Sequence, residues 1–250
     1  VFCFPDPRTE PWPHVCSPLA VTLVFASYLS VVALGPCCVR QQRRLELRGL
    51  LAAYSLAMMT LSSCSTRKLI SISFCLFQFL VTSVLGNYSY LCQPVDYSQS
   101  ELGMRMARVC WWFFFSKVFF ILHKKQEQVT LLHMYHRGSM LFSWWSGVKY
   151  VPGGQACFIG MLNSFVHIFM YGYSALASLG PRACRYRWWK RYLTIMQLCQ
   201  LVAIAAHSSY NLFTECPFPD GFNTAVFLYI LSLLALFLHC CYQTYLRGKR

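Results

Sequence analysis

The sequence predicts an all-α integral membrane protein with about seven transmembrane helices. Of its 250 residues, 56% are hydrophobic and only 12% are charged. A soluble domain normally carries about twice that charged fraction. The net charge of +14 does not indicate a nucleic-acid partner, because the basic residues occur in short clusters between apolar blocks.

The apolar blocks approach the length of about 20 residues that a helical span needs. Within one polytopic domain covering residues 1–250, the predicted spans are 19–39, 49–64, 107–122, 131–148, 155–179, 192–213 and 222–245. A further apolar block, Leu69–Gly86, is expected to be re-entrant or interfacial rather than a crossing, because a full crossing there would disrupt the charge distribution.

The basic residues orient these spans, with the N-terminus outside the cytosol and the C-terminus inside it. Fourteen of the 22 Lys and Arg residues then face the cytosol: Arg40, Arg43, Arg44, Arg48, Lys124, Lys125, Arg182, Arg185, Arg187, Lys190, Arg191, Arg247, Lys249 and Arg250. Six face the other side: Arg8, Arg67, Lys68, Arg105, Arg108 and Lys149. Lys117 and Arg137 remain within spans.

The same topology places two features on the non-cytosolic side. Asn87, followed by Tyr88 and Ser89, forms an N-glycosylation sequon. Cys92 and Cys216 both fall in loops of the compartment where disulfides persist, so they form either a bridge or two free thiols.

Polar residues gather on two consecutive spans. His133, His136 and Arg137 lie at i, i+3 and i+4, so they share one face of a helix. The next span carries a second polar face, made of Asn163, His167, Tyr171 and Ser174. Adjacent antiparallel helices would bring these faces together, in a pocket that opens to a mouth ringed with Lys and Arg. Such a mouth suits an anionic amphiphile such as acyl-CoA.

Metal binding is the main alternative for histidines in apolar helices. The chain has seven His, scattered apart from one pair, whereas di-iron sites need many histidine ligands in several boxes. We therefore expect no metal.

Several motifs occur in a fixed order, and together they carry a specific resemblance to a known family. They are Lys117-Val118, residues 119–126 (FFILHKKQ), 132–136 (LHMYH), 162–173 (LNSFVHIFMYGY), 188–194 (WWKRYLT) and 197–200 (QLCQ). With these motifs the chain resembles the very-long-chain fatty-acid elongase (ELOVL) family along nearly its whole length, and its ELOVL4-like branch most.

The resemblance implies a seven-helix enzyme of the endoplasmic reticulum membrane, multi-pass, with a lumenal N-terminus, a cytosolic C-terminus and a tunnel for the acyl chain. Such enzymes act as 3-oxoacyl-CoA synthases, which condense acyl-CoA with malonyl-CoA and need no cofactor. It also leaves room for homo- or hetero-oligomers with other elongases.

The resemblance further assigns residues to roles. His136 matches the proposed nucleophile, while His133 and His167 match the other active-site histidines. The implied substrate-binding positions are Lys124, Lys125, Asn163, Tyr171, Tyr173, Gln197, Gln200 and His207, although His207 also suits a purely structural role. Cys92 and Cys216 match a lumenal disulfide.

The chain departs from the family pattern in three places. Arg137 stands where the family's histidine box has its last histidine. About seven residues, including an acidic stretch, are missing between Val118 and Phe119, which leaves a predicted third span of sixteen residues, about 24 Å long. Residues 61–77 read as an insertion. These departures motivate one alternative, a non-enzymatic paralogue that associates with active elongases; an unrelated seven-helix receptor or transporter is another.

Overall fold

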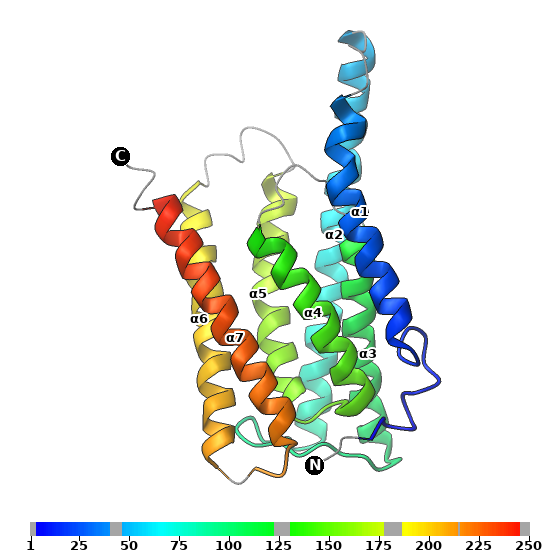
Figure 1. The fold of residues 1–250 in the computed structure, drawn as a ribbon, viewed down its shortest axis with the longest axis vertical. Helices are drawn as coiled ribbons and strands as arrows, with labels where there is room; N and C mark the ends of the chain where they lie inside the picture. Colours follow the sequence, from blue (N-terminus) through cyan, green and yellow to red (C-terminus); the bar gives the residue numbers. More distant parts are fainter. Residues whose placement is uncertain (1–3, 41–46, 123–130, 178–186, 215, 246–250) are drawn as a thin grey trace.

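A computed structural model describes residues 4–40, 47–122, 131–177, 187–214 and 216–245. Side chains are described for fewer residues; those of residues 31–40, 47–65, 119–122, 131, 133, 177, 187, 188, 190, 244 and 245 are not. All the regular structure in the described ranges is helical, and it forms one antiparallel bundle (Figure 1).

Seven helices are present in the described part of the chain: α1 Pro18–Arg40, α2 Leu47–Leu85, α3 Glu101–Leu122, α4 Leu131–Tyr150, α5 Gln155–Ala177, α6 Arg187–Phe213 and α7 Asp220–Tyr245. Successive helices run in opposite directions, so the connections 86–100, 151–154 and, in its described residues, 214 and 216–219 lie at the same end as residues 4–17 (Figure 1). We call this end the disulfide end and the opposite one the far end.

The disulfide that names this end joins Cys92 to Cys216, with 5.8 Å between the Cα atoms. The predicted pairing is therefore present, and it ties the α2–α3 connection to the α6–α7 connection. The two cysteines are separated by 124 residues in the sequence, so the bridge closes a loop of half the chain.

Local sequence explains several helix ends. Ser100 caps α3, because its Oγ accepts a hydrogen bond of 3.1 Å from the backbone nitrogen of Gly103. Asp96 in turn accepts a hydrogen bond from the Ser100 hydroxyl. Gly154, between α4 and α5, has a φ of +55°, and a Cβ there would lie 3.0 Å from Val95, so this turn requires glycine.

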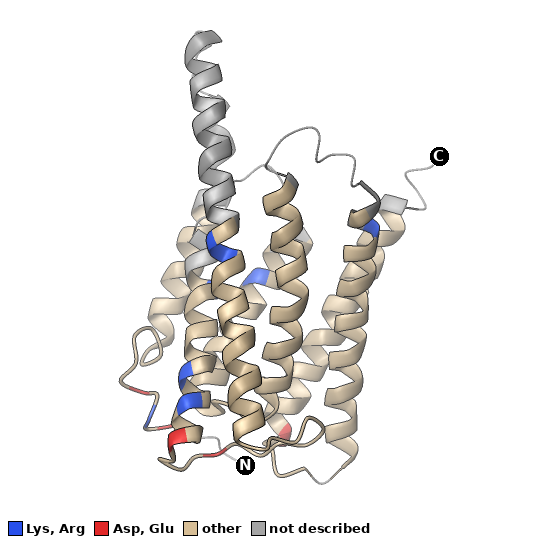
Figure 2. Ribbon diagram, turned by 180° about the vertical axis from the view of Figure 1, so that it is seen from behind, with Lys and Arg blue, Asp and Glu red and all other residues tan. Residues whose placement is uncertain are grey.

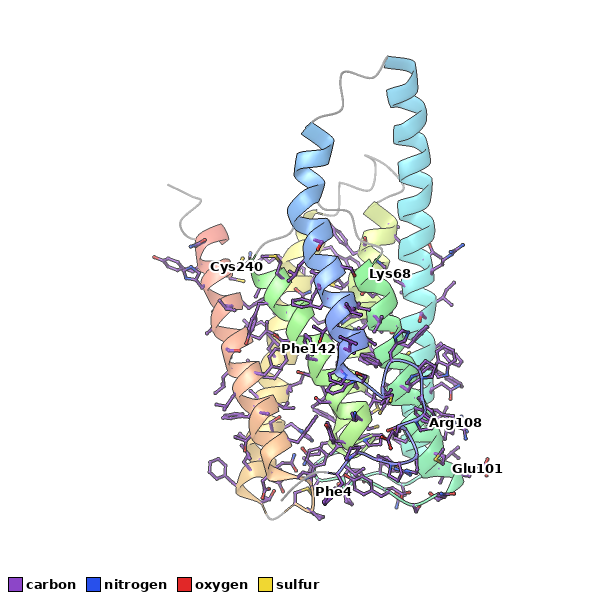
Figure 3. All side chains as sticks on the ribbon, turned by 45° about the vertical axis from the view of Figure 1, so that its right-hand side comes forward. Phe4, Lys68, Glu101, Arg108, Phe142 and Cys240 are labelled. Carbon is purple, nitrogen blue, oxygen red and sulfur yellow. A yellow bond between two sulfur atoms is a disulfide. The ribbon has the colours of Figure 1, made fainter. Side chains whose placement is uncertain are left out.

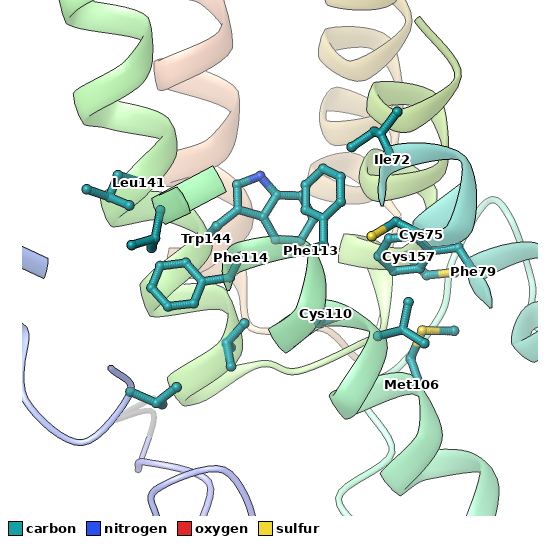
Figure 4. Packing of buried hydrophobic residues seen from close by; sticks show 14 of the residues in the cluster. Ile72, Cys75, Phe79, Met106, Cys110, Phe113, Phe114, Leu141, Trp144 and Cys157 are labelled. Carbon is teal, nitrogen blue, oxygen red and sulfur yellow. The ribbon is translucent and has the colours of Figure 1, made fainter. Parts of the chain in front are cut away.

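The main hydrophobic core lies between α1, α2, α3, α4 and α5 (Figure 4). Phe79 of α2, Phe113 and Phe114 of α3 and Leu141 of α4 are completely buried in it. Gly160 allows α5 to approach α2 closely, because a Cβ at that position would lie 2.7 Å from the Phe79 ring. A second, smaller core joins α6 to α7 through Leu201, Ile204, Ile230 and Leu233.

Helix α2 corrects the expectation for residues 69–86. Residues 69–85 are not a re-entrant or interfacial segment; they continue the same helix that contains the predicted span 49–64. Thr66–Leu85 is long and apolar enough to cross a membrane, as are Gln155–Leu176 and Asp220–Gln243 among the described helices. The helix continues because residues 50–85 contain neither Gly nor Pro to end it.

This correction changes the place of Arg67 and Lys68, which were expected on the side of the disulfide. Lys68 lies toward the far end of the bundle, whereas Glu101 and Arg108 lie at the disulfide end (Figure 3). A second correction concerns the third predicted span. Helix α3 has 22 residues rather than sixteen, which gives a length of about 33 Å, enough for the roughly 30 Å hydrocarbon layer.

The N-terminal segment is fastened to the disulfide end. Arg8 pairs with Asp6 at 2.7 Å and donates hydrogen bonds to the carbonyl oxygens of Asp96 and Ser98. Lys149 of α4 donates to the carbonyl oxygen of Cys16 at 2.7 Å. The acidic residues of the described ranges are all at this end: Asp6, Glu10, Asp96, Glu101 and Asp220 (Figure 2).

Asp96, in the α2–α3 connection, is the acidic residue whose ionisation the surrounding contacts favour. Its carboxylate accepts hydrogen bonds from Ser98 and Ser100, and the Arg8 guanidinium is close by; together they hold the pKa of Asp96 below its usual value. The ionised form of Asp96 is therefore part of the folded structure.

Candidate active site

A buried lysine marks the middle of the bundle. Lys117 of α3 is only 8% exposed, and its Nζ donates a hydrogen bond of 3.0 Å to Oδ1 of Asn163 on α5, which is 5% exposed. The same ammonium lies 4.4 Å from the centre of the Phe113 ring, a cation–π contact. A charge in such an apolar setting is costly, which makes it a functional candidate by default.

His167 lies one turn beyond Asn163 on α5. Its Nδ1 is 2.8 Å from the carbonyl oxygen of Asn163, and because a carbonyl can only accept, Nδ1 carries the hydrogen. In the neutral ring the Nε2 atom then holds the lone pair. The ring also packs edge-on against Tyr171, with 5.5 Å between centroids.

His136 approaches the same region from α4. His167 of α5 is within electrostatic range of His136 and Arg137 on α4 and of Lys117 on α3. Arg137 also lies over the Tyr28 ring of α1, with 5.8 Å between its Cζ atom and the ring centroid. In the described residues, no acidic side chain lies in this part of the bundle.

Helix α7 contacts α4 beside His136. The Nδ1 atom of His136 is 3.1 Å from the hydroxyl of Tyr229. One turn along α7, the Ser232 hydroxyl is 2.6 Å from that of Tyr135. We call these four residues the α4–α7 seam.

The structure thus gathers His136, Asn163, His167 and Tyr171 from the set that the sequence selected. The backbone of His133 lies in α4, one turn before His136, while its side chain is outside the description. Lys124 and Lys125 lie outside the described residues. Tyr173 is half-buried on α5, Gln200 is buried on α6, and Gln197 donates a hydrogen bond of 3.4 Å to the sulfur of Met170.

His207 lies elsewhere, at the disulfide end. Its Nε2 is 3.1 Å from the carbonyl oxygen of Tyr90, and its ring stacks on Phe158 at 4.3 Å between centroids. It lines a small pocket of about 10 Å³ together with Gln93 and Gln155. These contacts join His207 to the α2–α3 connection; whether its role is structural or in a tunnel stays a prediction.

Asn87 follows the end of α2, at the same end of the bundle. It is exposed and has a φ of +49°, a conformation that asparagine tolerates at the C-terminus of a helix. This fits a surface sequon, and its glycosylation stays a prediction.

Sequence reasoning missed Lys117 and Tyr229 as parts of the site. Lysine within a predicted span was itself a signal, since such residues usually face a protein interior. No comparable signal singled out Tyr229, because α7 contains aromatic residues along most of its length.

The fold and the site define a class, a multi-helix membrane protein that gathers two histidines and two cations between its helices. The chain matches the ELO: GNS1/SUR4 family over residues 13–250. It is 39% identical to very long chain fatty acid elongase 4 of Homo sapiens, over 98% of this chain and 77% of the relative. Identity is 37% to elongase 1 of Homo sapiens, over 98% and 88% of the two chains, and 36% to elongase 7 of Drosophila melanogaster, over 97% and 73%. The chain belongs to the ELO family of fatty acid elongases.

Proposed function

We propose that this chain is a very-long-chain 3-oxoacyl-CoA synthase, which condenses acyl-CoA with malonyl-CoA in fatty-acid elongation. Family membership supports the reaction class. The observation that supports the assignment to residues is the placement of His136 on α4 and His167 on α5 within electrostatic range of each other, with Lys117 and Arg137 nearby. No finding favours the non-enzymatic alternative.

The first half-reaction transfers the acyl group to the protein. The Nε2 lone pair of His136 attacks the thioester carbonyl, the C–S bond breaks, and CoA leaves with the proton that the imidazole releases. The product is an acyl-imidazole, which is an activated acyl donor. His167, with its lone pair on Nε2, passes this proton from the imidazole to the departing thiolate.

The second half-reaction forms the new carbon–carbon bond. Malonyl-CoA loses carbon dioxide, and the electron pair of the broken bond becomes the enolate of acetyl-CoA. This enolate attacks the acyl carbon, the bond to Nε2 breaks, and the imidazole takes up one proton from water. Lys117 and Arg137 supply positive charge for the developing enolate and oxyanion, because no acidic side chain neutralises them among the described residues.

The proposed topology has seven crossings of the endoplasmic reticulum membrane, with a lumenal N-terminus and a cytosolic C-terminus. In this arrangement residues 66–85 form the second crossing, so Arg67 and Lys68 join the cytosolic group of basic residues. This strengthens the positive-inside pattern. Lys124 and Lys125 bind the phosphates of CoA at the cytosolic mouth, and the acyl chain extends into a tunnel lined in part by Tyr171 and Tyr173.

The test is malonyl incorporation by microsomes that contain the expressed chain. Radiolabelled malonyl-CoA and a panel of saturated and unsaturated acyl-CoA substrates should give 3-oxoacyl products, and His136→Ala should abolish them. His239→Ala is the matched control, since His239 is an exposed histidine that contacts only Gln243 among the described residues. Equal products from the wild type and His136→Ala, or none over the whole panel, would refute the proposal.

A further inference from the structure

In the α4–α7 seam, His136 is hydrogen-bonded by a residue of α7, a helix that carries neither of the two cations. Tyr229 contributes a hydroxyl at 3.1 Å from Nδ1 of His136, across two helices that are far apart in the sequence. The Tyr229 ring is partly buried against the α6–α7 core, which includes Ile230 and Leu233. The hydroxyl is therefore held by packing of the ring rather than by loose surface contacts.

The neighbouring pair in the seam has a different role. The Ser232 hydroxyl donates to the carbonyl oxygen of Tyr229 at 2.7 Å, so Tyr135 donates its own hydrogen to Ser232. The Tyr135 ring lies 6.3 Å from the Tyr229 ring, between centroids. This pair supports the position of Tyr229 but makes no hydrogen bond to His136.

We propose that Tyr229 is a positioning residue for His136 that makes Nε2 the nitrogen that carries the acyl group. This inference rests on the proposed function, and it assigns a role to a helix from which the sequence selected no site residue. Before acyl transfer, Tyr229 accepts a hydrogen bond from Nδ1–H, which leaves the lone pair on Nε2. After transfer and loss of the Nδ1 proton, the same hydroxyl donates to Nδ1.

A tyrosine suits both states because its hydroxyl is a donor as well as an acceptor. A hydrogen bond donated to Nδ1 withdraws electron density from the acylated ring and makes the imidazole a better leaving group when the enolate attacks. Tyr229 thus holds the ring in one orientation through both half-reactions. Because Tyr229 acts through the imidazole, we expect it to change the rate rather than the substrate affinity.

The test compares Tyr229→Phe with Ser232→Ala in the full-length enzyme. Tyr229→Phe removes the hydroxyl and keeps the ring, whereas Ser232→Ala removes the neighbouring hydroxyl of the seam. We expect Tyr229→Phe to lower kcat about tenfold or more with KM unchanged within about twofold, by analogy with the hydrogen-bond partners of metal-bound histidines, whose loss typically costs 10–100-fold. Ser232→Ala should change kcat less than about threefold, and the two variants should have similar thermal midpoints.

A second pair of variants separates the hydrogen bond from packing. Glutamine and methionine have similar shapes, but only glutamine can both accept a hydrogen bond from Nδ1–H and donate one to Nδ1, whereas the methionine sulfur is a weak acceptor only. Tyr229→Gln should therefore retain a higher kcat than Tyr229→Met, even if both are less stable than the wild type. Equal kcat values in this pair, or a Tyr229→Phe kcat no lower than that of Ser232→Ala, would overturn the inference.

The two proposals fail separately in this design. If the wild type and His136→Ala release CoA from acyl-CoA at the same rate, the proposed function itself fails. If His136→Ala abolishes CoA release and Tyr229→Phe leaves it unchanged, the condensing function stands and the role of Tyr229 is refuted.

Discussion

Replacing Asn163 by leucine should destabilise the protein more than its own lost contacts suggest, because it removes the acceptor of the buried Lys117 ammonium. A hydrogen bond to a charged group contributes about 1.5–3 kcal/mol, and an unpaired buried charge adds its desolvation cost. We therefore expect Asn163→Leu to lower the free energy of unfolding by about 3 kcal/mol.

Adding Lys117→Met to Asn163→Leu should recover part of this lost stability. Lys117→Met removes the charge and leaves only a neutral amide oxygen unsatisfied, at a cost of about 1–2 kcal/mol. In the double variant both polar groups are replaced by apolar groups of similar shape, a change that can be nearly neutral. The double variant should thus be more stable than Asn163→Leu alone, with a coupling energy of about 2 kcal/mol or more.

Unfolding by SDS in mixed micelles measures this cycle for the purified protein. Ser30→Ala is the control, because Ser30 is exposed on α1 and, within the described residues, its hydroxyl bonds only to its own helix. Additive losses, with the double variant at the sum of the two single variants within about 0.5 kcal/mol, would refute the pairing of Lys117 with Asn163.

Two further predictions concern the disulfide end. Cys92→Ser should lower the thermal midpoint measured in detergent, because the bridge closes a loop with a sequence separation of 124, for which the chain-entropy model gives an upper limit of about 5 kcal/mol. Membrane insertion already restricts the chain, so the measured loss should be smaller; Cys16→Ser, at an exposed free thiol, is the control. Asp96 should make stability depend on pH: its pKa is lowered by folding, so its contribution is complete above the ordinary pKa of about 4 and declines as the pH falls below it. Thermal midpoints between pH 3 and 6 should therefore fall less steeply in Asp96→Asn than in the wild type.

The controls make both predictions decisive. If Cys92→Ser and Cys16→Ser have equal thermal midpoints, the bridge does not stabilise the fold. For the pH dependence, Glu10→Gln replaces another acid at the same end that lies in the exposed N-terminal segment. The assignment to Asp96 is wrong if Glu10→Gln flattens the acid decline as much as Asp96→Asn does.

The sequence predicted the helical class and the two polar faces because both depend on local periodicity. Asn163, His167 and Tyr171 follow at intervals of four residues, and an α-helix places them on one side whatever surrounds it. The same holds for His136 and Arg137 on the preceding helix. The pairing of Cys92 with Cys216 came from the family resemblance, and the structure contains it.

Residues 69–85 were misassigned because the charge count treated Arg67 and Lys68 as a loop. Two basic residues do not end a helix, and the absence of Gly and Pro from residues 50–85 was the better signal. The contacts of Lys117 with Asn163 and of His136 with Tyr229 join helices distant in sequence. They depend on how the helices rotate and pack, which local patterns do not specify.

The α4–α7 seam also lies where two packing units meet. One hydrophobic core is formed by helices α1 to α5, and the other joins α6 to α7. The distance from Tyr229 to Nδ1 is 3.1 Å, so a relative displacement of about 0.5 Å would bring it to the limit of a hydrogen bond. The orientation of the His136 ring therefore depends on the relative position of the two packing units. Any lipid, detergent or neighbouring protein that shifts α6 and α7 as a rigid pair would change the hydrogen bond to that imidazole, and so the orientation of its ring, without touching it.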